Sequence, residues 1–103
     1  MCLLMVLTMI SARAATQDLF DAEVVVPNQT SGVRSGATGD ALKEVLVRVA
    51  GQDAVLQTAA AKQMLKKPDA LVQQYRYFYE PGSEPPLLKL WVRFDGDAIR
   101  NSL

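Results

Sequence analysis

Residues 72–94 read VQQYRYFYE PGSEPP LLKLWVRF and contain the clearest pattern in the chain. Every second residue in both halves is apolar or aromatic: Tyr75, Tyr77 and Tyr79 in the first, and Leu88, Leu90, Val92 and Phe94 in the second. Alternation with period two predicts two β-strands, over residues 72–80 and 87–94. The intervening segment has the length of a hairpin loop, so we expect these strands to pair antiparallel.

A further strand is predicted upstream, over residues 19–26. It ends in three consecutive valines, and Pro27-Asn28 supplies the turn signal that follows it. The next apolar residues, Leu42, Val45, Leu46 and Val49, have the spacing of an amphipathic helix. Gly51 follows this helix at the position where a residue with left-handed backbone conformation usually ends a helix.

The start of this first helix contains Gly32, Gly36 and Gly39. Glycine costs about 1 kcal/mol relative to alanine inside a helix, so we expect frayed first turns and a secure helix only from about Asp40. Ser31 or Thr38 is the expected N-terminal cap.

Shorter helical elements are predicted after Gly51. Asp53 is expected to cap a helical turn, residues 58–67 to form a second helix, residues 68–71 to add one turn, and Asp95 to cap a terminal helix. The predicted fold class is therefore α+β, with a small antiparallel sheet (one N-terminal strand plus a C-terminal hairpin) packed against two or three helices. The terminal helix stops within its second turn, so we expect the domain to be truncated at its C-terminus.

The first ten residues, MCLLMVLTMI, are nearly all apolar, and SARAA follows. Such a run is shorter than a membrane span, and Ala12 and Ala14 form the A-x-A pattern of a cleavage site. We expect residues 1–14 to be a signal peptide, and residues 15–103 to be a single periplasmic domain with no stable membrane span. The alternatives are an uncleaved inner-membrane anchor and a buried N-terminal element of a cytosolic protein.

The composition excludes several kinds of chemistry. The 103 residues hold 11 basic and 11 acidic side chains and no histidine, and the single cysteine, Cys2, lies in the expected signal peptide. A balanced charge argues against nucleic-acid binding, and the missing histidine and mature thiol remove common metal ligands and nucleophile activators. We expect no enzyme activity, catalytic residue, cofactor or metal. The carboxylates nearest the strand ends are Asp95, Asp97 and Glu23, and paired carboxylates can catalyse glycoside hydrolysis or hold a divalent cation, but helix capping explains Asp95 without such chemistry. Residues 32–39 follow a strand and open a helix, but they lack a phosphate-loop motif.

Aromatic and cationic side chains gather on the predicted hairpin. We expect an interaction surface formed by Tyr75, Tyr77, Tyr79, Trp91, Arg76 and Arg93. The alternative is that one face of the hairpin packs on the helices while cross-strand aromatic pairs cover the other.

Four segments carry a family resemblance: residues 19–26, 41–51, 72–77 and 90–95. In this order and spacing they resemble the DUF2066 family of bacterial envelope proteins, over its N-terminal portion. The resemblance implies an envelope location and an architecture, and it implies no catalytic residue.

The function expected from these observations is that of a noncatalytic module of the bacterial envelope. Its sheet edges or its aromatic face would contact another envelope protein or its own C-terminal part. Two alternatives stay open: a substrate-positioning lobe of a longer envelope enzyme whose catalytic residues lie beyond Leu103, and a nonfunctional gene fragment.

Overall fold

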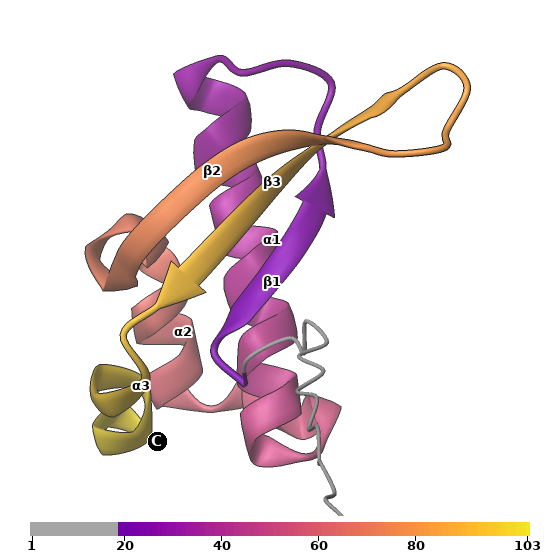
Figure 1. Cartoon of the computed structure of the whole chain (residues 1–103). Coiled ribbons are helices and arrows are strands. Elements are labelled where there is room, and N and C mark those ends of the chain that lie inside the picture. The colour runs from indigo at the N-terminus through magenta and orange to yellow at the C-terminus, as the bar shows by residue number, and fades with distance from the viewer. Residues whose placement is uncertain (1–18) are drawn as a thin grey trace, which may run out of the picture.

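A three-stranded antiparallel sheet lies at the centre of the fold in the computed structural model, which describes residues 19–103 (Figure 1). Its strands are β1 (Asp21–Val25), β2 (Val72–Glu80) and β3 (Leu87–Phe94), arranged in the order β1-β3-β2. Both predicted hairpin strands and their antiparallel pairing are confirmed, and the upstream strand is slightly shorter than predicted. The expected signal peptide and its cleavage site lie outside the described residues.

The central strand β3 bonds to both neighbours. Tyr77 of β2 stands opposite Leu90, and Ala22 of β1 stands opposite Val92. A shift in register between Val72 and Gln74 marks a bulge at the start of β2. Beyond this bulge β2 and β3 pair without interruption to the hairpin loop.

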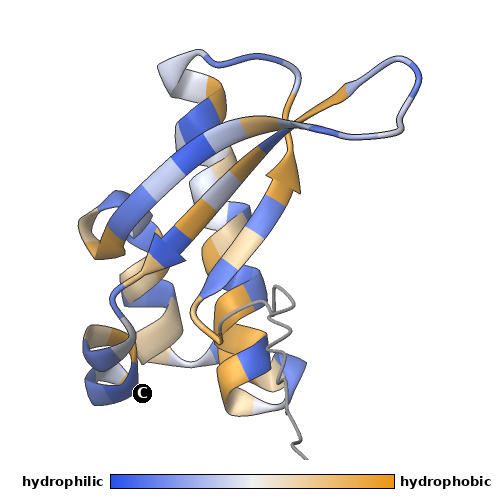
Figure 2. Ribbon diagram, viewed as in Figure 1, coloured by the Kyte–Doolittle hydropathy of each residue, from blue (hydrophilic) through white to orange (hydrophobic). Residues whose placement is uncertain are grey.

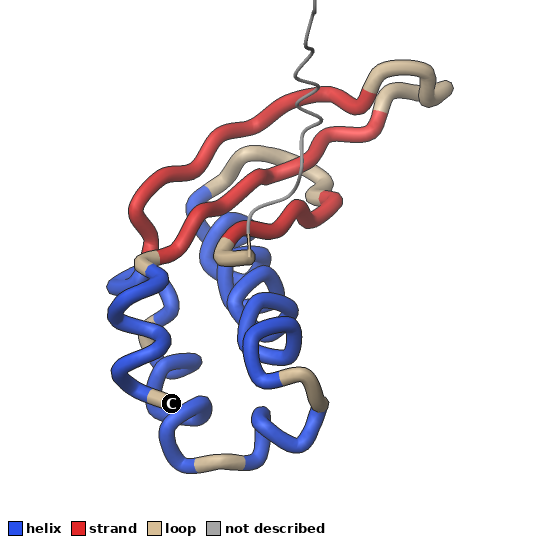
Figure 3. Tube along the Cα trace, turned by 60° about the horizontal axis from the view of Figure 1, so that its bottom comes forward, coloured by secondary structure: helices blue, strands red, loops and turns tan. Residues whose placement is uncertain are grey.

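The helices lie on one side of the sheet (Figure 3). They are α1 (Ser31–Ala50), the 3-10 turn η1 (Asp53–Gln57), α2 (Ala59–Lys66), the 3-10 turn η2 (Pro68–Leu71) and α3 (Gly96–Ser102). The predicted α+β class is confirmed. Among residues 19–103, no helix combines the length and the hydropathy needed to cross a membrane.

Helix α1 begins at Ser31, so the prediction of a helix secure only from Asp40 is wrong. Its cap is Thr30, neither Ser31 nor Thr38: the Thr30 hydroxyl accepts a hydrogen bond from the Val33 amide at 3.4 Å. Thr38 instead donates to the Arg34 carbonyl oxygen at 2.7 Å within the helix. The helix buries Ala37, Thr38, Ala41 and Leu42, and this packing outweighs the low helix propensity of the glycines.

The other helix ends follow the predicted chemistry, with one exception. Gly51 is left-handed (φ 79°), and its amide donates to the Val47 carbonyl oxygen at 2.8 Å. The Asp95 carboxylate caps α3 by accepting from the Ala98 amide at 3.1 Å. Asp53 makes no cap, because it is the first residue of η1 and Gln52 precedes it with no side-chain cap bond.

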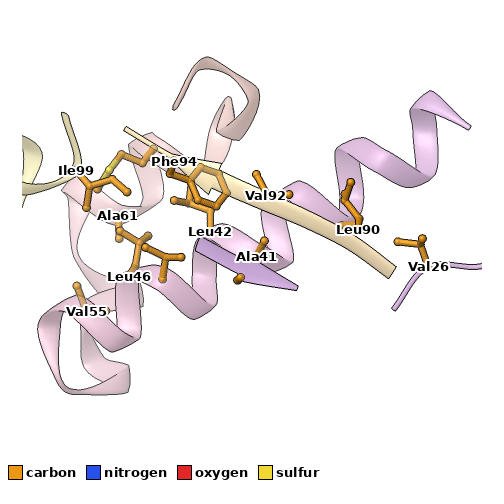
Figure 4. Packing of buried hydrophobic residues seen from close by; sticks show 14 of the residues in the cluster. Val26, Ala41, Leu42, Leu46, Val55, Ala61, Leu90, Val92, Phe94 and Ile99 are labelled. Atoms are coloured by element: carbon orange, nitrogen blue, oxygen red, sulfur yellow. The ribbon is translucent and has the colours of Figure 1, made fainter. Parts of the chain in front are cut away.

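The hydrophobic core lies between the sheet and α1 (Figure 4). The side of β3 that faces the helices is apolar and buried: Leu88, Leu90, Val92 and Phe94. Across from it, α1 buries Ala41, Leu42, Val45 and Leu46, and the core is completed by Ala61, Met64 and Ile99, among others. The orange bands along β3 and α1 in Figure 2 trace these residues. A fully buried leucine contributes about 1.5–3 kcal/mol, so this cluster is the main source of stability.

The glycines of α1 provide a test of its N-terminal boundary. A Cβ at Gly32 or Gly36 meets no atom within 4 Å. We therefore expect Gly32→Ala and Gly36→Ala each to raise the free energy of unfolding by about 0.5–1 kcal/mol in urea denaturation. Gly51→Ala should lower it by about 1 kcal/mol, since alanine is strained in the left-handed region. Equal, negligible effects of the first two substitutions would mean that this end of α1 is frayed in solution.

Candidate functional site

The face of the sheet turned away from the helices carries polar and aromatic side chains. Residues that stand opposite each other in an antiparallel sheet share a face, so the register assigns every side chain to one side. The outward face consists of Glu23 and Val25 of β1, Lys89, Trp91 and Arg93 of β3, and Gln74, Arg76, Phe78 and Glu80 of β2. Asp21, opposite Arg93, completes this set, which we call the open face.

Trp91 lies at the centre of the open face between two arginines. Arg76 is its direct partner on β2, and the Arg76 guanidinium carbon lies 4.6 Å from the Trp91 ring centroid. Arg93, two residues along β3, places its guanidinium carbon 5.2 Å from the same centroid. Both distances suit a cation–π interaction. The three side chains therefore form one rigid cluster, which we call the Trp91 cluster.

Lys89 links the two outer strands across β3. Its ammonium forms an ion pair with Glu80 of β2, and it lies 3.7 Å from the Glu23 carboxylate of β1. The hydrogen bond with Glu80 is the main cause that raises the pKa of Lys89 above its ordinary value of 10.5, and the charge of Glu23 adds to it. Lys89 is thus held in its charged form beside the Trp91 cluster.

The opposite end of the open face is fixed to α1. Arg93 lies 3.9 Å from the Asp21 carboxylate, which is 4% exposed. Arg48 of α1 donates to the carbonyl oxygens of Leu19 (3.0 Å) and Asp21 (2.7 Å) and forms an ion pair with Glu44 at 2.7 Å. These hydrogen bonds attach the start of β1 to α1 and so hold this end of the sheet against the helix.

The six residues predicted from the sequence to form one interaction surface lie on two faces of the sheet. Trp91, Arg76 and Arg93 meet on the open face, but the three tyrosines stand opposite Val92, Leu90 and Leu88 and therefore point to the helix side. Tyr77 packs against the core. Tyr75 and Tyr79 remain 46% and 62% exposed, and the Arg34 guanidinium lies 4.9 Å from the Tyr75 ring centroid. The physical reason is the register of the hairpin, which places the tyrosines on the buried side of β3.

Sequence reasoning missed the contribution of Phe78, Lys89 and Glu23 to the open face. Phe78 stands opposite Lys89 and is half-buried beside the Trp91 cluster. The alternation in each strand already separates these residues from the apolar set. Matching the apolar side of residues 87–94 to the tyrosines would have placed Phe78 with Lys89 and Trp91.

The carboxylates considered for catalysis are dispersed. Asp95 caps α3, Asp97 lies in the first turn of that helix, and Glu23 contacts Lys89 on the sheet. Within residues 19–103, no three acidic, histidine or cysteine side chains gather into a group able to hold a metal ion. The open face, where aromatic, cationic and acidic side chains contact one another, is therefore the candidate functional site among the described residues.

Comparison with known proteins identifies one family. A family model described as "Domain of unknown function (DUF8605)" matches residues 14–103. This finding corrects the resemblance to DUF2066, which rested on four short segments, because the family model that matches belongs to a different family. No curated protein and no solved structure matches the chain.

Substitution of Lys89 tests the electrostatics of the open face. The folded-state pKa of Lys89 is raised, so its ion pairs stabilise the fold fully below the unfolded-state pKa and lose this effect as pH rises through the folded-state pKa. Lys89→Met should therefore be less stable than the wild type at neutral pH, with a difference that shrinks above pH 10.5 in urea denaturation. Lys43→Met, on an exposed position of α1, is the control and should show no such convergence.

Proposed function

Because the chain belongs to the DUF8605 family, whose description assigns no function, we propose one from the described surface: a noncatalytic, exported module that binds another protein of the bacterial envelope. The contact surface of this proposal is the open face. The observation that carries it is the Trp91 cluster, in which a tryptophan on the central strand lies between two guanidinium groups with no described helix above it.

The side chains of the open face suit a protein partner. Tryptophan and arginine are the residues most often found where a few side chains supply most of the binding energy of an interface. Phe78 extends the apolar area next to Trp91. Among the described residues, no carboxylate lies at ion-pair distance from Arg76. The Arg76 guanidinium can therefore donate hydrogen bonds to a carboxylate of a partner protein.

Ligands that stack on aromatic rings fit this face less well. The guanidinium groups of Arg76 and Arg93 already lie over the Trp91 ring, so a sugar or a nucleobase would have to displace an arginine. The charges on the face are also balanced, with Arg76, Lys89 and Arg93 against Asp21, Glu23 and Glu80. A nucleic-acid partner would require a positive excess.

The location in this proposal rests on the N-terminal sequence. Residues 1–10 are nearly all apolar, and Ala12 and Ala14 form the small-residue pattern that precedes a signal-peptidase cut. The family match starts at residue 14, so the apolar run lies outside the shared domain. A module exported in this way would meet its partner in the periplasm.

A photoreactive residue at position 78 tests the contact surface in cells. We expect Phe78→p-benzoylphenylalanine to crosslink one protein of the envelope fraction, identified by mass spectrometry. Adding Trp91→Ala should reduce that adduct by about tenfold or more, as expected for removal of a central anchor. The same photoreactive residue at Lys62, exposed on α2, is the control. An adduct that also forms from position 62, or that survives Trp91→Ala, would contradict the proposed surface.

The proposed location has its own test, in the mass and the cellular fraction of the expressed chain. Cleavage after Ala14 predicts a periplasmic species whose first residue is Ala15. Substituting Ala12 and Ala14 with arginine should block processing, since signal peptidase needs small residues there. Recovery of the wild-type chain with Met1 intact among cytoplasmic proteins would overturn export and leave the protein contact open.

A further inference from the structure

The outer edge of β2 presents unpaired backbone groups. Along β3, successive backbone amides point to opposite neighbours. The Phe94 amide donates to the carbonyl oxygen of Phe20, just before β1, at 2.9 Å. The next amide, that of Asp95, donates to the carbonyl oxygen of Leu71, just before β2, at 2.8 Å. The odd-numbered residues of β3 therefore bond to the even-numbered residues opposite them on β2. It follows that Tyr75, Tyr77 and Tyr79 direct their backbone N–H and C=O groups away from the sheet.

The two edges of the sheet differ in how they are covered. At the β1 edge, Arg48 donates to the carbonyl oxygens of Leu19 and Asp21, which occupies the start of that strand. Among the described residues no strand lies beyond β2 (Figure 1), and the regularly paired portion of β2 spans residues 74–80. An uncovered edge of this length is a template for pairing with another strand.

The helix side of β2 is hollowed beside the start of the strand. A groove of about 510 Å³ runs below the start of the strand, lined by Arg34, Thr38, Asp69, Val72, Gln73, Gln74 and Tyr75. Tyr75 and Tyr79 are among the most exposed large hydrophobic side chains of the described residues. The edge thus combines free backbone groups with aromatic rings that the monomer leaves partly in water.

We propose that this edge binds the same edge of a second copy, giving a two-fold symmetric dimer whose axis passes beside Tyr77. Two β2 strands would pair antiparallel, with Tyr77 opposite Tyr77 of the second copy and Tyr75 opposite its Tyr79. The exposed rings would then cover one another beside the groove. This inference goes beyond the proposed function, because it rests on the backbone edge of β2 and on a different partner.

The sequence of β2 is compatible with pairing to itself in this register. On the open face, Gln74 would stand opposite Glu80 of the second copy and Arg76 opposite its Phe78, so that no like charges face each other. A shift of the two-fold axis toward Gln74 would place Arg76 opposite Arg76 of the second copy, and repulsion between these like charges disfavours that register. A shift toward Glu80 would shorten the paired segment. The centred register uses the whole of residues 74–80.

The dimer would join two sheets into one of six strands. Both helical layers would lie on the same side, and both Trp91 clusters would lie on the other. In a two-fold symmetric interface the same patch of each copy forms the contact, so no second, different surface is needed.

A charge-swap experiment tests the dimer in the chain purified as cells process it. One variant carries Tyr75→Lys and Tyr79→Lys, and the other carries Tyr75→Glu and Tyr79→Glu. In the proposed register each variant places like charges opposite each other twice. We expect analytical ultracentrifugation to show a wild-type dimer and a rise of about tenfold or more in the dimer dissociation constant of each variant. Mixing the two variants should restore association as a heterodimer, detected by native mass spectrometry.

The matched control is Val25→Lys on the other edge strand, an exposed position that should leave the wild-type dimer unchanged. Three results would overturn the proposal: a wild-type chain that is monomeric up to millimolar concentration, a dimer that survives both double variants, or a mixture that fails to form heterodimers. Recovery in the mixture separates loss of an interface from loss of folding.

Amide hydrogen exchange gives an independent measurement on the unmodified chain. In the monomer the amides of Tyr75, Tyr77 and Tyr79 face solvent, whereas those of Arg76 and Phe78 bond to β3. We expect protection of the three tyrosine amides to increase with protein concentration, while the other two amides stay protected throughout. Concentration-independent exchange at the three tyrosines would contradict pairing at this edge.

Discussion

The burial of one side of β3 is the constraint on which the other features depend. Leu88, Leu90, Val92 and Phe94 must face the apolar stripe of α1, because this contact supplies most of the core. Side chains in a strand alternate between faces, so Lys89, Trp91 and Arg93 are forced to the opposite side. The Trp91 cluster is therefore a consequence of how the core forms, and the neighbouring strands supply Arg76, Glu23 and Glu80 in register with it.

The width of a helix explains why β2 keeps an uncovered margin. A helix is about 10 Å across with its side chains, and strands are about 4.8 Å apart, so one helix covers about two strands. Helix α1 packs under β1 and β3, and only the half-buried Tyr77 of the β2 tyrosines joins the core periphery. Tyr75 and Tyr79 then remain exposed beside free backbone groups. The sheet thus carries the Trp91 cluster on its open side and partly exposed tyrosine rings on its helix side at the β2 edge.

Local patterns predicted most of the elements. The alternation in residues 72–94, the valines before Pro27, Gly51 and Asp95 each act through neighbouring residues only, and each is confirmed. The start of α1 was mispredicted because helix propensity was weighed without the packing of Ala37, Thr38 and Ala41 against the sheet. The resemblance to DUF2066 was wrong as well, because the family model that matches residues 14–103 is DUF8605.

Local sequence patterns were enough to establish the strands, most of the helices, the ends at Gly51 and Asp95 and the α+β class, because periodicity and capping depend on near neighbours. The grouping of side chains into surfaces depended on how the strands pair. A shift of one residue in the hairpin register exchanges the two faces of a strand, and the loop of residues 81–86 leaves that register open to sequence reasoning. Only the packing of β3 against α1 put the tyrosines on one side and Trp91 with Arg76 and Arg93 on the other.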